Sequence, residues 1–221
     1  MDLTPLLDSP WLPPAVGAAL VAVPTAWRFS RHAVTLVHEL GHAGVAVATG
    51  RRLNGISLHA DTSGLTVSRG KPRGPGMVAT AAAGYLAPSV VGLLLITAVR
   101  LGWVLEALWV ALGLLALTLV FIRNLFGLLV VLVAGAAVAA TAYRADADLQ
   151  VVVVESAAWF WLLAAPRTVV ELWAHRRRRR TGTSDADVLA RLTHLPPAVW
   201  NLVLLVLTLA ALWPAVDRLL D

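Results

Sequence analysis

Residues 32–49 read HAVTLVHELGHAGVAVAT, and this stretch decides how the rest of the chain is interpreted. It is long and apolar enough to cross a bilayer, yet it contains the polar cluster His38-Glu39-Leu40-Gly41-His42. Ionisable side chains at membrane depth are costly and usually mark a functional site. In the pattern H-E-x-x-H, two histidines one helical turn apart bind zinc, and the glutamate acts as a base. We therefore predict a zinc-motif helix over 31–49.

The composition of the whole chain is that of a membrane protein. Of 221 residues, 58% are hydrophobic and 14% are charged, whereas soluble domains have about 45–50% and about 25%. The net charge of +5 comes mostly from arginines at the ends of apolar runs, which is typical of a topology signal and not of nucleic-acid binding. Runs of spanning length predict an all-α polytopic fold of about six to seven transmembrane helices in one domain, 1–221. The predicted spans are 11–27, 31–49, 76–99, 103–122, 125–142, 149–173 and 195–216. The prolines and short length of the first also suit an interfacial segment.

A short segment after the zinc-motif helix has a different pattern. Residues 55–60 and 64–68 alternate apolar and polar side chains, which is typical of strands with one buried face. The residues Asp61-Thr62-Ser63-Gly64 between them favour a turn. We expect a β-hairpin over 55–68.

Positive charges predict the orientation in the membrane, because cytoplasmic loops carry more Lys and Arg. Successive loops lie on alternate sides of the membrane, and the larger set of positive charges falls on one of these sides. That side is therefore expected to be cytoplasmic. With seven spans, the N-terminus also lies on the cytoplasmic side, and residues 31–49 run from outside to inside. The larger set comprises Arg51, Arg52, Arg69, Lys71, Arg73, Arg123, Arg176 to Arg180 and Arg191.

A catalytic zinc needs a third protein ligand, with a water in the fourth position. The chain has no cysteine, so the ligand must be a His, Asp or Glu. The candidates are Glu155, Glu171 and two Asp-Ala-Asp triplets, 146–148 and 185–187. Each triplet is also a plausible helix start, where aspartate is favoured, so local reasoning leaves the choice open.

Four segments together resemble the M50 metallopeptidases, the site-2 protease clan, and are most similar to the M50B-like branch. His38 to Ala43 resembles the zinc motif, and Ala82 to Pro88 resembles the A-G-Y segment of the next helix. Arg123 to Gly127 resembles R-N-x-F-G, and Ser184 to Asp187 resembles the S-D-A segment before the last helix. The resemblance covers residues 31–200.

The resemblance implies zinc held by His38, His42 and an aspartate of the segment 184–200. The matching position is Asp185, with Asp187 as the alternative. Glu39 is expected to handle protons, because bound zinc lowers the pKa of its water to about 7. Asn124 contacts the substrate or the oxyanion, or else makes a structural bond between helices.

We therefore expect an integral membrane protein of the bacterial plasma membrane that cleaves membrane-anchored proteins as a zinc metalloprotease. The resemblance also implies that the hairpin captures an extended substrate by strand addition. One alternative is an inactive metal-binding scaffold of the same fold, although neither Glu39 nor a ligand has been lost. The other is a metal-ion transporter, which needs polar groups on several helices, whereas the spans 76–99 and 103–122 hold Glu106 as their only acid.

Overall fold

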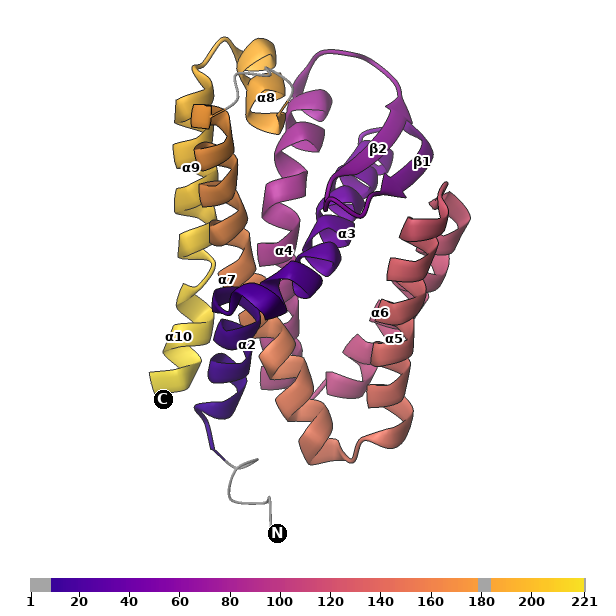
Figure 1. Ribbon diagram of the computed structural model, residues 1–221, viewed down its shortest axis with the longest axis vertical. Coiled ribbons are helices and arrows are strands. Elements are labelled where there is room, and N and C mark those ends of the chain that lie inside the picture. The colour runs from indigo at the N-terminus through magenta and orange to yellow at the C-terminus, as the bar shows by residue number, and fades with distance from the viewer. Residues whose placement is uncertain (1–8, 179–183, 221) are drawn as a thin grey trace.

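The zinc-motif helix begins at Pro24, directly after a short interruption between two helices. The computed structural model describes residues 9–178 and 184–220, without the side chains of 177 and 178. Helix α2 (Leu12–Ala22) rises from the lower end of the molecule, and α3 (Pro24–Ala48) continues to the upper end (Figure 1). Val23 between them is extended, as expected for a residue before proline. The spans predicted over 11–27 and 31–49 are therefore one kinked passage, because α2, at 11 residues, is too short to cross alone.

Within the described residues, five segments are long and apolar enough to span a membrane. They are α4 (Pro75–Leu101), α5 (Val104–Phe121), α6 (Leu125–Arg144), α7 (Ala147–Arg178), and α9 (Pro197–Ala210) taken together with α10 (Trp213–Leu220). Helix α3 is long enough but too polar to count among them. The predicted all-α membrane fold with a short hairpin is confirmed, and its most polar passage is the one that carries the H-E-x-x-H motif.

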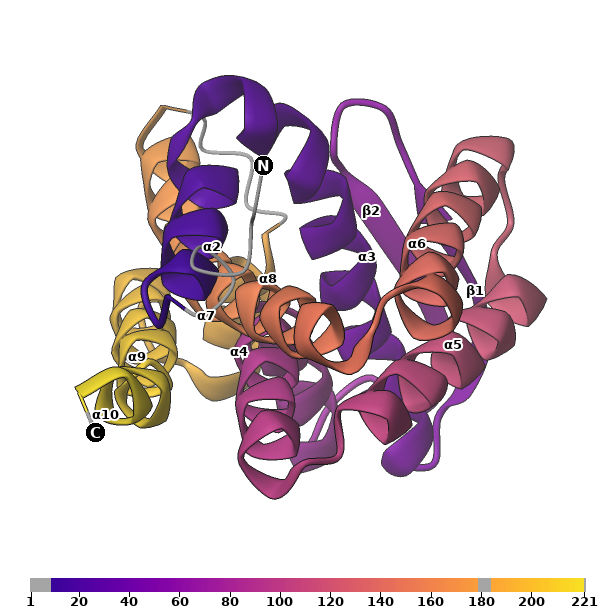
Figure 2. The ribbon, with the colours of Figure 1, turned by 90° about the horizontal axis from the view of Figure 1, so that it is seen from below.

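Helices α4 and α7 form the centre of the bundle. Seen from below, α2, α3, α5 and the pair α9–α10 surround them (Figure 2). The short helix α8 (Asp185–Thr193) lies at the upper end, where Leu189 packs in a buried cluster with Ala81, Val169 and Leu204 from α4, α7 and α9. This cluster fixes α8 against α4, α7 and α9.

The hairpin consists of β1 (Arg52–Leu58) and β2 (Gly64–Arg69), which pair antiparallel with an irregularity between Leu53 and Gly55. The alternating segment therefore forms the predicted hairpin, although β1 begins three residues earlier than expected. The far edge of β1 meets the start of α6, where Ile56 O accepts from Arg123 N at 2.9 Å. Ile56 and Leu58 are buried against α3 and α6. The hairpin is thus clamped between two helices, and β2 is its outer strand.

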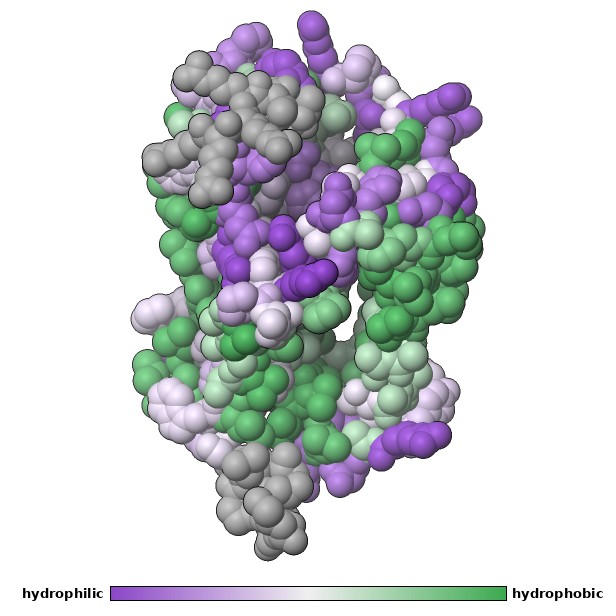
Figure 3. Space-filling view, viewed as in Figure 1, coloured by the Kyte–Doolittle hydropathy of each residue, from purple (hydrophilic) through white to green (hydrophobic). Residues whose placement is uncertain are grey.

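Helices α5 and α6 pack mainly on each other and touch the rest of the bundle near their ends. A cavity of about 870 Å³ separates them from α3, α4 and α7, and small and aliphatic side chains line it. The space-filling view shows the opening beside the hydrophobic surface of this helix pair (Figure 3). The bulk of the pair is exposed in the isolated chain, which is expected of helices that face lipid.

The two ends of the molecule differ in charge. The upper end carries the hairpin, the start of α4 and the end of α7, and most of the larger set of positive residues lies there (Figure 1). Of the arginine run, 179 and 180 lie outside the described residues. The start of α2 lies at the lower end, opposite this positive set (Figure 1). The prediction of a shared side counted two crossings before residue 50, and the side of the membrane that each end faces stays a prediction.

Candidate metal centre

Two histidines of α3 converge on one point. His38 and His42 are four residues apart, so they project from the same face of the helix. Their Nε2 atoms lie 3.0 Å from each other. His42 Nδ1 donates to the carbonyl oxygen of Thr80 on α4 at 2.7 Å. Because a carbonyl can only accept, this bond places a proton on His42 Nδ1 and leaves Nε2 as the ring atom that can bind a metal.

A carboxylate of α8 completes the group. Asp185 Oδ2 lies 3.1 Å from His38 Nε2 and 3.3 Å from His42 Nε2. The three atoms form a nearly equilateral triangle, and tetrahedral ligands at zinc-binding distances are about 3.3 Å apart. These separations would therefore allow the three atoms to hold one ion in common. Within the described residues, His38, His42 and Asp185 form a group that could hold a metal ion.

The donor set agrees with a bound cation. Without an ion, two imidazole nitrogens and a carboxylate would meet at a point with too few protons to separate them. Burial raises the pKa of Asp185, but hydrogen bonds with His38 and His42 outweigh this effect and hold that pKa well below its usual value. The carboxylate is thus kept ionised, which is the form that binds metal.

Asp187, the other aspartate of the triplet, stabilises the start of α8. Ser184 and Asp187 form a capping box at the start of α8, in which each side chain bonds the backbone of the other residue. Asp187 also pairs with Arg176 at the end of α7. Burial raises the pKa of Asp187, whereas its bonds with Arg176 and Ser184 lower it below the usual value. Of the two aspartates in the triplet 185–187, the first faces the histidines and the second holds the helix start.

Helix α4 closes the site from the side. A Cβ atom at Gly84 would lie 2.5 Å from His42 Nε2 and 2.6 Å from His38 Nε2. Only glycine lets α4 approach this closely, which gives a physical reason for the glycine in the A-G-Y segment. The next residue, Tyr85, packs its ring against His38 edge to face, with 4.7 Å between the ring centres.

Glu39 is held by the hairpin. Its side chain is 5% exposed, and Thr66 Oγ1 of β2 donates to Glu39 Oε2 at 2.6 Å. The other oxygen, Oε1, lies against Gly64, where a side chain would displace it. The hairpin thus holds one carboxylate oxygen of Glu39 and leaves the other without a protein donor among the described residues.

Other predicted residues lie apart from the three ligand atoms. The amide of Asn124 bonds both backbone groups of Leu58, with Leu58 N donating to Oδ1 at 3.2 Å and Nδ2 donating to Leu58 O at 2.6 Å. Its substrate or oxyanion role stays a prediction, and its amide has a structural partner. Three other candidate ligands have partners of their own: Asp146 caps α7, Glu155 pairs with Arg218, and Glu171 pairs with Arg31 and Arg167. Asp148 is exposed on the first turn of α7.

Some residues of the site gave no signal in the sequence. Thr66 lies on a strand that alternation predicts, but alternation does not tell which polar residue meets Glu39. Thr80 orients His42 through its backbone carbonyl group, so the type of side chain at position 80 gives no signal of this role in the sequence. Both depend on how α4 and the hairpin pack on α3, which spacing along the chain cannot give.

Comparison with known families agrees with this geometry. A family model described as Peptidase M50B-like matches residues 12–215, which is most of the chain. No curated protein and no solved structure gives a significant match. The match includes the metal-binding group, both helices that supply it and the hairpin. The chain therefore belongs to the Peptidase M50B-like family, a family of metallopeptidases.

Proposed function

We propose that this protein is an intramembrane zinc metalloprotease of the site-2 type, which hydrolyses a peptide bond of membrane-anchored proteins. The observation that carries the proposal is the convergence of His38 Nε2, His42 Nε2 and Asp185 Oδ2 within 3.0–3.3 Å of one another. Family membership supports peptidase chemistry for this donor set.

The chain's own residues would divide the work as follows. His38, His42 and Asp185 hold Zn²⁺, which polarises a carbonyl and lowers the pKa of a bound water to about 7. Glu39 takes a proton from the attacking water at Oε1 and later gives it to the leaving amine. Thr66 keeps Glu39 in place through Oε2. The Thr80 carbonyl fixes the tautomer of His42.

The hairpin would bind the substrate. Strand β2 pairs with β1 along one edge, and Thr66 on β2 contacts Glu39. A substrate segment unwound from its helix needs backbone partners in the membrane. Addition of that segment to the other edge of β2 would supply them beside Glu39.

We also propose an orientation. The arginine-rich upper end, which holds the metal centre, faces the cytoplasm of a bacterial plasma membrane, by the positive-inside rule. The start of α2 is then on the opposite side. Substrates would be cleaved near the cytoplasmic face.

A single substitution tests the activity. We expect Glu39→Gln to abolish cleavage of a co-expressed single-span reporter while the protein still accumulates and binds zinc, because the substitution removes only the base. Tagged reporter fragments on a gel give the readout. Equal processing by both proteins would rule out metal-dependent proteolysis and favour a scaffold.

A further inference from the structure

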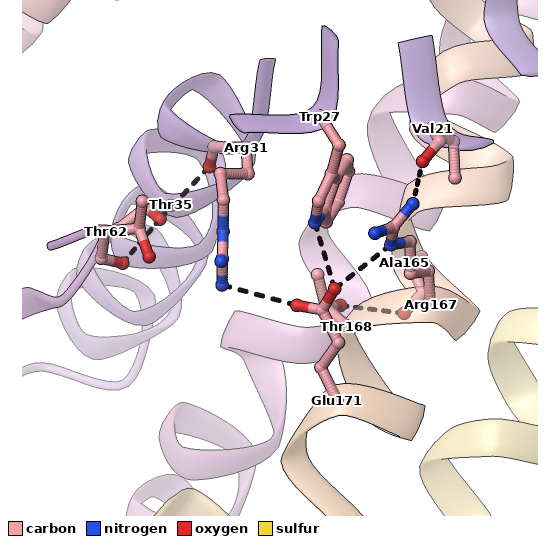
Figure 4. Close-up of polar contacts among 9 residues, drawn as sticks. All are labelled: Val21, Trp27, Arg31, Thr35, Thr62, Ala165, Arg167, Thr168 and Glu171. Atoms are coloured by element: carbon pink, nitrogen blue, oxygen red, sulfur yellow. Dashed lines mark hydrogen bonds and ion pairs between the residues drawn. The ribbon is translucent and has the colours of Figure 1, made fainter. Parts of the chain in front are cut away.

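A second polar centre lies where α2, α3 and α7 meet (Figure 4). Glu171 accepts three hydrogen bonds there, from Trp27 Nε1 at 2.9 Å, Arg167 Nε at 3.0 Å and Arg31 Nη2 at 3.3 Å. Two guanidinium groups share one carboxylate, so the centre carries one positive charge in excess. Charged groups this far along membrane helices are expensive unless they serve a purpose.

Arg167 has a structural purpose. The proline break after α2 leaves the last carbonyl groups of that helix without helical partners. Arg167 Nη1 donates to Val21 O, and Ser30 Oγ donates to Leu20 O at 3.0 Å. The Arg167 guanidinium also lies 4.2 Å from the centre of the Trp27 ring. Arg167 therefore holds the junction of α2 and α3 together.

Arg31 is bound less fully, although its guanidinium also lies 5.9 Å from the centre of the Trp27 ring. Its guanidinium has five N–H donors, and among the described residues it makes one hydrogen bond, to Glu171. Its side chain is 39% exposed. The acid of the nearby hairpin turn, Asp61, is bonded to Ser63 at 2.6 and 2.9 Å. The excess charge of the centre thus resides on Arg31, which still has donors to offer.

Arg31 shares a helix face with the metal centre. Trp27, Arg31, Thr35, His38 and His42 follow at steps of three or four residues, which places them in one stripe on α3. Arg31 is seven residues from His38, roughly 10 Å along the helix, or about three residues of extended chain. Hydrophilic residues reach from the upper end of the molecule to about its middle, where the first turns of α3 lie (Figures 1 and 3).

The metal centre does not balance the positive charge of Arg31, because the negative charges of Glu39 and Asp185 together match the charge of one divalent cation. We propose that Arg31 binds a carboxylate of the peptide substrate, about three residues from the cleaved bond. An aspartate or glutamate there gains charge-assisted hydrogen bonds and neutralises the Glu171 centre. This inference rests on the proposed function, and it makes Arg31 a residue that determines substrate specificity.

The test uses the full-length protein and a library of single-span reporters with varied residues near the arginine-rich face. The parent substrate is a reporter that the wild-type protein cleaves and Glu39→Gln does not. Aspartate and asparagine are then exchanged at each position two to four residues from the cleaved bond, on both sides. At one position we expect aspartate to raise kcat/KM about tenfold over asparagine, mainly through KM.

Variants of the enzyme test whether Arg31 causes the preference for aspartate. Arg31→Gln should remove the aspartate preference, Arg31→Lys should keep part of it, and Arg31→Glu should favour lysine in the substrate. Arg28→Gln is the matched control, because Arg28 is an exposed arginine on the same helix, and it should keep the full preference. Protein level and zinc content report whether each variant is folded.

The outcomes separate the two proposals. If the library yields no reporter whose cleavage depends on Glu39, the proposed function fails, and this inference fails with it. If Glu39-dependent cleavage occurs but aspartate and asparagine are equivalent at every position, the protease stands and the role of Arg31 is wrong. An aspartate preference that survives Arg31→Gln would overturn it equally.

Discussion

Gly84 shows how closely the neighbours of the metal centre are specified. It lies on α4 against both imidazoles, at a distance that no Cβ atom could keep. Four residues earlier on the same helix, the carbonyl of Thr80 orients His42. Residues that orient metal ligands commonly change metal affinity by factors of about 10–100 when they are altered. The zinc-motif helix thus depends on α4 as much as on its own histidines.

The substitution Gly84→Ala tests this dependence. We expect it to weaken zinc binding by about 10–100-fold, because the new methyl group pushes both histidines out of position. Competition with a zinc chelator measures the affinity in detergent. Gly44→Ala is the control, since a Cβ at Gly44 meets no atom within 4 Å, and wild-type affinity for Gly84→Ala would contradict the packing described here.

Residue spacing predicted part of the centre and left the rest open. His38, Glu39 and His42 stand at helical spacing in one short stretch, so one face of one helix was enough to find them. Asp185 is 143 residues beyond His42, and local reasoning could not separate a ligand from a helix cap. In the structure both roles occur in the triplet 185–187, one on each aspartate. The spacing also gave no sign of the pair Arg31–Glu171, because its two members come from helices far apart in the chain.

At the scale of elements, the hairpin is the part that joins the site to the rest of the bundle. Its outer strand positions Glu39, and its inner strand is fastened to the start of α6. The Asn124 side chain continues the ladder of β1 by bonding both backbone groups of Leu58. We interpret Asn124 as the clamp of the hairpin.

Asn124→Ala distinguishes this clamp from a contact with the oxyanion. Loss of two hydrogen bonds to a partly buried strand should lower the stability by roughly 1–3 kcal/mol, with a lower thermal midpoint in detergent. Asn54→Ala, at an exposed asparagine on β1, should leave the midpoint unchanged. An unchanged midpoint in Asn124→Ala together with lost cleavage would favour the oxyanion role.

The sequence predicted the elements better than their connection. Long apolar runs and strict alternation located most of the spanning helices and the hairpin to within about five residues, although α3 begins seven residues before the predicted span 31–49. The passage α2–α3 was misjudged because hydropathy does not reveal where a chain turns. Pro24 marks a break, yet the direction after it depends on Arg167 and Ser30, which hold the freed carbonyl groups of α2. Those contacts join segments far apart in the chain.

At the scale of the whole molecule, the single passage α2–α3 changes the expected topology. The start of α2 and the hairpin are at opposite ends (Figure 1). If the arginine-rich end is cytoplasmic, the start of α2 is on the outer side. The absence of cysteines makes this easy to examine, because each introduced cysteine is then the only one in the protein.

Single-cysteine labelling tests the topology. We expect Lys71→Cys to react with a membrane-impermeant maleimide only when the cytoplasmic face is accessible, and Ser9→Cys to react in intact spheroplasts. The reason is that α2 and α3 cross the membrane once. Labelling of both positions from the same side would contradict the single crossing and restore two separate spans.

The zinc content of the purified protein tests the central claim most directly. We predict one zinc ion per chain in the wild type, loss of the ion in Asp185→Asn, and retention in Asp187→Asn, because only the first carboxylate faces His38 and His42. Elemental analysis of the three proteins gives the answer. A wild-type protein that binds no zinc, or an ion lost from Asp187→Asn and kept in Asp185→Asn, would contradict the account.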